Sequence, residues 1–167
     1  MTGLAAQITS TNTRTRSSLI SDVALALLRG GLGVDFVAHG SQKIFGAWGG
    51  FGMSGTAKFF DSLGAHPGML WAVLAAIVEF GGGIAMLLGL FTRVAGVAIA
   101  IDMLLAIALY NAGHGFFTET PTDGWEINYL ILCMALAAAL LGPGRYALAT
   151  IVRGDGTNTM RRTIASL

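Results

Sequence analysis

The sequence has few of the charged residues that a water-soluble domain carries on its surface. Asp, Glu, Lys and Arg make up only 11% of the 167 residues, and the net charge is +1. Average soluble domains carry about 25% charged residues. Hydrophobic residues instead make up 54% of the chain, and its mean hydropathy is +0.68. Charged residues this few cannot cover a water-facing surface. The composition therefore indicates one membrane-embedded domain.

Cysteines and basic clusters are also scarce. Cys133 is the single cysteine and lies in an apolar run, which excludes an intramolecular disulfide and a CxxC redox pair. Lys and Arg are scattered along the chain and form no basic patch, so no nucleic-acid partner is expected. No Ser-His-Asp order or phosphate-cradling glycine loop can be made out. The familiar soluble-enzyme and nucleic-acid-binding classes are therefore set aside.

Four apolar stretches are long enough to be membrane helices. They are expected over about 21–45, 68–90, 93–112 and 126–141. Between the first two, residues 57–63 predict a short amphipathic helix on the membrane surface or at the mouth of the bundle. Because open sheets are excluded in hydrocarbon, the expected fold is all-α, an integral membrane four-helix bundle.

The ends of the chain are polar. We expect a disordered cytoplasmic arm over 1–20, a membrane domain over 21–147 and a cytoplasmic tail over 148–167. Basic residues favour the cytoplasmic side, and four spans divide them unequally. One side receives Arg14, Arg16, Arg93, Arg145, Arg153, Arg161 and Arg162, and the other receives only Lys43 and Lys58. Both termini are therefore predicted to be cytoplasmic.

A polar stripe runs along the first apolar stretch, LLRGGLGVDFVAHGSQKIFG. It consists of Arg29, Asp35, His39, Gln42 and Lys43. At about 100° per residue, these side chains fall within an arc of about 140°. The stripe cannot face lipid, so the other helices are expected to cover it. The last turn of the helix, with Gln42 and Lys43, is expected to emerge on the outer side.

Two acids lie near the middle of later spans. Glu79 and Asp102 are each about ten residues, or about 15 Å, from the expected hairpin at 89–93. A charge at this depth costs several kcal/mol unless it is paired, so pairing with Arg29 is expected. The group is either a structural ion pair or part of a proton relay or ligand site.

The outer half of the stripe is a candidate ligand site. Lys43 or His39 can donate to a polar head group, such as a quinone carbonyl, while an apolar tail lies among the helices. The full set is Asp35, His39, Gln42, Lys43, Glu79 and Glu126. The alternative is that Lys43 snorkels and His39 is a satisfied interfacial histidine. His39 and His114 are weak metal candidates because their spacing is not a ligand motif, so no metal and no covalent cofactor is expected.

Four segments of the sequence closely resemble the DoxX family of small bacterial membrane proteins. They are LRGGLGVDFVAHGSQKIFG, GTAKFFDSLGAHPG, EFGGGIAMLLGLFTR and GPGRY, in that order. The resemblance covers about residues 20–147. It implies a four-span protein of the bacterial cytoplasmic membrane. It also implies a link to thiosulfate:quinone oxidoreduction, or to a membrane assembly with superoxide dismutase and a sulfurtransferase that answers oxidative stress.

Three functions follow as hypotheses. The first is an accessory or quinone-proximal subunit of a membrane redox system, acting with partner proteins and binding a quinone. The second is a non-enzymatic anchor that recruits soluble partners through its termini or its outer loop. The third is a transport path for a small solute along Arg29, Asp35, Glu79 and Asp102. Small-residue helix faces leave both internal packing and a homo-oligomer open.

Overall fold

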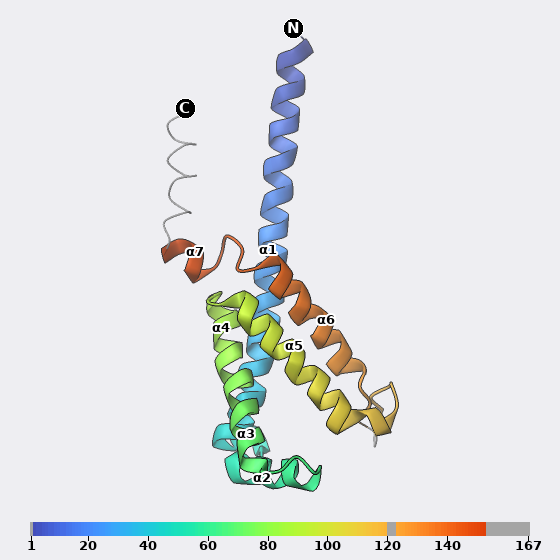
Figure 1. The fold of residues 1–167 in the computed structure, drawn as a ribbon. Coiled ribbons are helices and arrows are strands. Elements are labelled where there is room, and N and C mark those ends of the chain that lie inside the picture. Colours follow the sequence, from blue (N-terminus) through green and yellow to red (C-terminus); the bar gives the residue numbers. More distant parts are fainter. Residues whose placement is uncertain (1, 120–122, 153–167) are drawn as a thin grey trace.

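The structure is a computed structural model that describes residues 2–119 and 123–152, with side chains over 19–119 and 123–150. Every regular element in these ranges is helical, which confirms the predicted all-α class (Figure 1). In chain order the elements are α1 (Thr2–Phe45), η1 (Ala47–Gly49), α2 (Gly52–Ser62), α3 (Gly68–Ala76), the π-helical turn η2 (Ile77–Gly81), α4 (Gly82–Leu88), α5 (Thr92–Leu109), η3 (Asn111–His114), α6 (Glu126–Leu141) and α7 (Leu148–Val152).

Helix α1 begins much earlier than the sequence predicted. Its backbone is helical from Thr2, where a disordered arm was expected over 1–20. No glycine or proline interrupts residues 4–29, and extending an existing helix costs less than nucleating a new one. The N-terminal part of α1 therefore continues past the other helices (Figure 1). Most of the tail expected over 148–167 lies outside the described residues.

The later helices match their predicted bounds to within about one turn. Elements α3, η2 and α4 form one helix from Gly68 to Leu88, and α5 follows after a short hairpin. These two helices are long and apolar enough to cross a membrane, judged by length and composition, and α6 is a shorter apolar helix. The short helix expected over 57–63 is present as α2, which begins five residues earlier, at Gly52.

The core lies where α1, α4, α5 and α6 meet. Its buried residues are Leu32, Phe36, Met86, Ala95, Ile99, Ala100, Met103, Ala135 and Ala138. Small side chains bring α5 and α6 together, because a Cβ added at Gly96 would lie 2.7 Å from the Ala135 carbonyl oxygen. Close backbone approach of this kind is how helices associate in membranes, where lipid removes the hydrophobic driving force.

Helix α1 packs against η2 and α4 through glycines as well. A Cβ at Gly40 would lie 2.5 Å from the Phe80 nitrogen, and one at Gly83 would lie 2.7 Å from the Val37 nitrogen. Only a glycine hydrogen fits at these two contacts. The contacts therefore fix the axial position of α1 relative to the neighbouring helix. The two helices run antiparallel in a single register.

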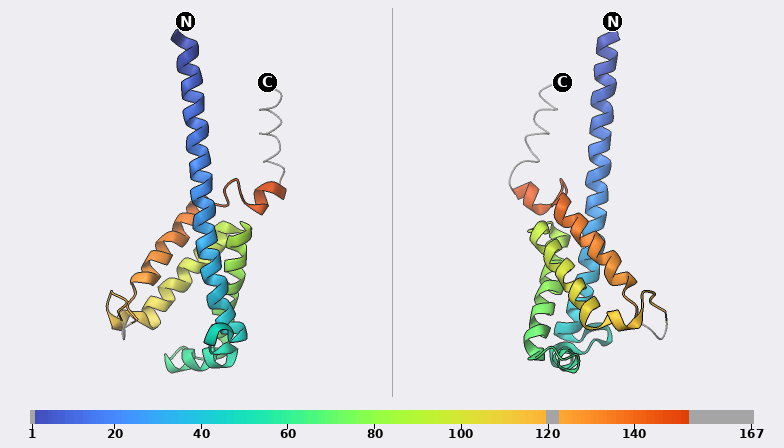
Figure 2. Two further views of the ribbon diagram at one scale, coloured as in Figure 1. Left: turned by 180° about the vertical axis from the view of Figure 1, so that it is seen from behind. Right: turned by 45° about the vertical axis from the view of Figure 1, so that its right-hand side comes forward.

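The bundle is tight at one end and open at the other. We call the end with the hairpin between α4 and α5 the terminus end, and the end with α2 and the 113–125 loop the loop end. Toward the loop end, the α5–α6 pair diverges from α1 and α3, as the views in Figures 1 and 2 agree. Helix α2 lies across this end, next to α3 (Figure 2).

Two arginines close the terminus end. Arg29, only 3% exposed, donates from Nη1 to the Met86 carbonyl at 3.2 Å and from Nη2 to the Tyr146 carbonyl at 3.1 Å. Arg93 donates to the carbonyls of Ala139 and Leu140 at 3.0 and 2.9 Å. Each guanidinium thus bonds to at least one carbonyl in the last turn of a helix, where the helix dipole favours positive charge.

The α2–α3 junction is fixed by Asp61. Its carboxylate accepts a hydrogen bond from the Gly68 amide at 2.7 Å and lies 2.8 Å from Nδ1 of His66. These bonds favour the ionised form and hold the pKa of the Asp61 carboxyl below its usual range. The junction positions α2 over the open end of the bundle.

The glycine register gives a first prediction. Gly40→Ala should destabilise the protein by about 1–3 kcal/mol, because the new methyl group meets the backbone at Phe80. Gly30→Ala is the matched control on the same helix, since nothing lies within 4 Å of its added Cβ. That variant should be neutral or stabilising by up to about 1 kcal/mol. Unfolding in detergent measures both, and equal effects would contradict the register.

The Asp61 network gives a pH prediction. Because the folded-state pKa of Asp61 is lowered, its stabilising contribution is present above the unfolded value of about 3.9 and is lost as pH falls through the folded value. Between about pH 6 and about pH 3, the melting temperature should fall more for the wild type than for Asp61→Asn. Ser62→Ala, which removes only a hydroxyl bonded to the Phe59 carbonyl, should keep the wild-type pH dependence. Parallel curves for all three proteins would refute the assignment.

Candidate functional site

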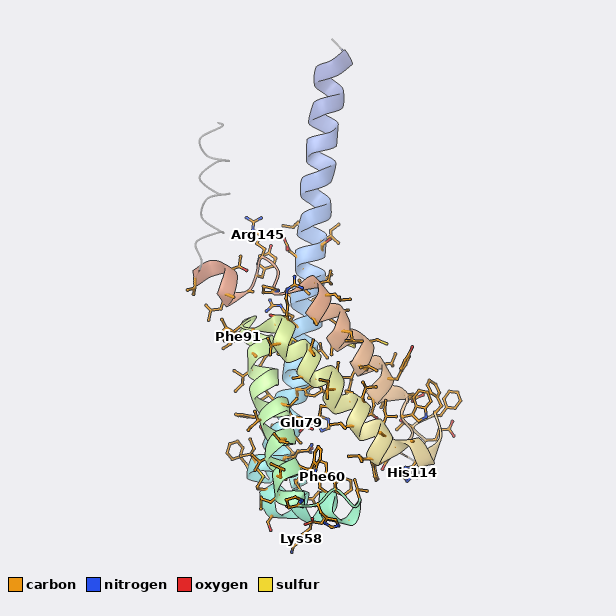
Figure 3. All side chains as sticks on the ribbon, viewed as in Figure 1. Lys58, Phe60, Glu79, Phe91, His114 and Arg145 are labelled. Atoms are coloured by element: carbon orange, nitrogen blue, oxygen red, sulfur yellow. The ribbon has the colours of Figure 1, made fainter. Side chains whose placement is uncertain are left out.

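A buried ion pair lies near the middle of the bundle. Lys43 Nζ is 2.7 Å from Glu79 Oε2, and the two side chains are 24% and 8% exposed. Glu79 belongs to the π-helical turn η2, and such turns recur at functional sites. In Figure 3 Glu79 lies between Phe91 at the terminus end and Lys58 at the loop end. The pair joins α1 to the second apolar helix inside the protein.

An apolar cavity of about 330 Å³ lies on one side of this pair. It is bounded by α2, by α3 with η2, and by α5. Its lining includes Phe60, Trp71, Leu74, Ile101 and Leu105, together with Asp102, Lys43 and Glu79. Leu74 and Ile101 are about half exposed, so this cavity reaches the apolar outer surface of the helices. Its lining suits an apolar ring or chain.

A second cavity, of about 470 Å³ and lined by polar and apolar residues together, lies on the other side, bounded by α1, α5, α6 and the loop residues Thr118, Asp123 and Gly124. Its polar lining residues are Asp35, His39, Lys43, Glu79, Tyr110, Asn111, Thr118, Asp123 and Asn128. His39 Nε2 lies 3.7 Å from Asp35 Oδ1, one turn away on α1. We call this space the vestibule.

The two cavities share part of their walls. Lys43 and Glu79 line both, as do Phe59 and Tyr110. The ion pair therefore stands at the junction between an apolar compartment and a polar one. A molecule with a polar head and an apolar body could lie across this junction with each part in a matching environment.

Tyr110 links the loop to this junction. Its hydroxyl donates to Asp123 Oδ2 at 2.8 Å, and its ring packs edge-on against Phe59 at 5.3 Å. This hydrogen bond raises the pKa of the Tyr110 phenol, so the hydroxyl stays a donor. Asn111 donates to the Asp123 carbonyl at 2.5 Å and holds the same stretch of loop. The loop is thereby fastened to the end of α5.

The expected pairing of Arg29 with the two acids is not what the structure contains. Arg29 bonds to carbonyls at the terminus end, and the partner of Glu79 is Lys43. On α1, Arg29 and Lys43 are 14 positions apart, which separates them by about 21 Å. An arginine side chain cannot bridge that length. Within the described residues Asp102 makes no hydrogen bond or ion pair, and it faces the apolar cavity.

The structure scatters the other candidates. Gln42 lines a smaller space beside Gly50 and Thr56, and Lys43, expected to emerge outside, turns inward to Glu79. Glu126 starts α6 but lines none of the three cavities described here. His114 bonds through Nδ1 to the Tyr110 carbonyl and lies apart from the wall that holds His39. Among the residues with described positions, no group of three His, Cys, Asp or Glu gathers as metal ligands would.

Sequence reasoning missed several wall residues. Trp71, Phe60 and Tyr110 line the cavities, yet each was assigned only to a helix or its end. Tyr110 and Asn111 had a readable signal, since they form a polar pair where an apolar span stops. Trp71 had none, because an indole near a helix end is also typical of membrane interfaces.

Comparison with known proteins shows which family this sequence matches. The sequence model of the DoxX family matches residues 24–112. A Bacillus subtilis protein named "Putative oxidoreductase CatD" is 34% identical over 127 residues, covering 76% of this chain and 85% of its own. Two Escherichia coli inner membrane proteins, YqjF and YphA, are 29% and 33% identical, covering 77% and 78% of this chain and 92% and 86% of their own. No solved structure matches the chain.

The ion pair predicts that removing one partner destabilises the protein more than removing the other. Lys43→Met should destabilise the protein by about 3 kcal/mol, because it leaves buried Glu79 without a countercharge. Glu79→Gln should cost less, since Lys43 is partly exposed and can turn toward the vestibule. The double variant, with no unpaired charge, should be more stable than Lys43→Met. Unfolding in detergent measures the set, with exposed Lys58→Met as the neutral control. Additive losses would show that the two groups are not coupled.

Proposed function

Because the chain belongs to the DoxX family of membrane proteins, we propose that it is a quinone-proximal accessory subunit of a membrane redox system. It crosses the bacterial cytoplasmic membrane four times, through α1, the Gly68–Leu88 helix, α5 and α6, with both termini in the cytoplasm. Its ligand is an isoprenoid quinone or a similar lipid-soluble molecule. Electrons come from a partner protein.

The junction of the two cavities is the observation that carries this proposal. The apolar compartment has aromatic and aliphatic walls and reaches the outer surface of the helices between α3 and α5. A ligand dissolved in the bilayer has direct access there. The Lys43–Glu79 pair lies at the inner boundary of that compartment, where Lys43 can donate a hydrogen bond to a carbonyl oxygen. Polar groups at one end of a mostly apolar pocket fix the orientation of a ligand.

The relatives support the redox setting. One of them carries the name oxidoreductase, and two are named inner membrane proteins. Family resemblance also suggests soluble partners of the superoxide dismutase and sulfurtransferase type. In this proposal those partners supply the electron chemistry, and the helices supply a site where a lipid-soluble acceptor or donor is held.

The transport and anchor hypotheses receive less support from the geometry. A transport path was expected to follow Arg29, Asp35, Glu79 and Asp102, but Arg29 is engaged by carbonyls at the terminus end. An anchor needs no internal cavity, so the two cavities give it no support. Soluble partners that copurify equally with the wild type and with Lys43→Met would favour the anchor.

Trp71 offers a direct test of quinone binding. It lines the apolar cavity, whereas Trp48 and Trp125 do not. In a Trp48→Phe/Trp125→Phe background, titration with a short-chain ubiquinone or menaquinone in detergent should quench the remaining emission saturably. Lys43→Met should weaken this binding at least tenfold, about 1.4 kcal/mol, because the carbonyl loses its donor. Lys58→Met, on the exposed side of α2, should bind as the parent does.

Two results would overturn the proposal. The first is linear, non-saturating quenching that matches free tryptophan in the same micelles. The second is equal affinity in the Lys43→Met and Lys58→Met variants, provided that both remain folded by circular dichroism. Mass spectrometry of quinones that copurify from native membranes gives an independent measurement.

A further inference from the structure

Two ionisable side chains lie deep along α1 without full burial. Asp35 and His39 are 45% and 57% exposed, and both line the vestibule. Asp35 is two turns, about 12 Å, beyond Lys43 toward the terminus end. Glu79, the partner of Lys43, is itself about 16 Å along its helix from Gly68. These groups therefore lie at depths where hydrocarbon would surround the protein.

Ionisable groups at such depth need either partners or water. The Asp35–His39 contact is long, at 3.7 Å, and leaves about half of each side chain uncovered. The wall opposite them carries polar groups of its own among apolar side chains, namely Asn128 on α6 and Asn111 after α5. A space with polar groups on several sides is roomy and polar enough to be hydrated, unlike the apolar cavity beyond the ion pair.

The vestibule is closed toward the terminus end. Leu32, Ile99, Ala135 and Ala138 are each 0–1% exposed and fill the space between the four helices there. Beyond them, Arg29 fastens α1 to the Met86 carbonyl in the last turn of the second apolar helix. Toward the loop end, the helices diverge, and the vestibule wall is made of loop residues Thr118, Asp123 and Gly124.

We infer that the vestibule is a water-filled half-channel, open to the aqueous phase at the loop end and sealed from the aqueous phase at the terminus end. Water reaches the Lys43–Glu79 pair and Asp35 from one side only. Any proton that these groups or a bound ligand exchange comes from or goes to that side. The inference goes beyond quinone binding and holds whether or not the apolar cavity takes a quinone.

Thiol labelling tests this arrangement. In a Cys133→Ser background, which removes the native free thiol, single cysteines replace Asn128 and Ile131 on the vestibule wall. Exposed Lys58 and Arg145, which Figure 3 places at opposite ends, are replaced in separate variants to mark the two faces. Membrane vesicles of both orientations are treated with a membrane-impermeant cationic methanethiosulfonate. An Ala135→Cys variant, at a fully buried position, is the dry control.

Asn128→Cys and Ile131→Cys should react in the vesicles in which Lys58→Cys reacts, at least tenfold faster than in the opposite orientation. Ala135→Cys should react in neither. Reaction from the Arg145→Cys face would overturn the sealed end, and no reaction of either wall cysteine would overturn the hydrated vestibule. Two wall positions are used so that the test stands if one variant misfolds. Gel filtration in detergent checks that each variant is folded and not aggregated. Since no quinone is added, a failure here is distinct from a failure of quinone binding.

Discussion

The Lys43–Glu79 ion pair is the constraint on which the arrangement of this protein depends. A charge in the hydrocarbon region costs several kcal/mol unless it is paired or hydrated. One partner comes from α1 and the other from the π-helical turn η2, so the pair forms in only one alignment of these helices. That alignment decides which residues face the two cavities. The same pair separates an apolar compartment from a polar one.

Close packing at glycines supplies the alignment of the helices. Gly40 and Gly83 allow α1 and α4 to touch, and Gly96 does the same for α5 against α6. Arg29 and Arg93 then bind carbonyls across neighbouring segments at the terminus end. At the loop end the helices diverge, and α2 together with loop residues Thr118, Asp123 and Gly124 lines the cavities between them. The two ends therefore differ in the arginine clamps, which only the terminus end has among the described residues.

The helix bounds were readable from the sequence because apolar length and stop signals determine them. The second, third and fourth apolar helices start and end close to where they were predicted, and α6 spans Glu126–Leu141, the expected range. The partner of Glu79 was not readable. Counting residues from the hairpin gives its depth, but which α1 residue lies at that depth depends on the glycine contacts between two helices. No single-helix pattern contains that information.

The polar stripe on α1 is a second case in which a single-helix pattern does not give the position of a residue in the bundle. In angular projection its five residues share about 140°, which suggested one continuous polar face. Along the axis, however, Arg29 and Lys43 are about 21 Å apart, longer than a ligand head group. The structure accordingly divides the stripe into a clamp at Arg29, a vestibule wall at Asp35 and His39, and an ion pair at Lys43. Because one face of a long helix passes through several environments, its polar residues are best assigned by depth first and by angle second.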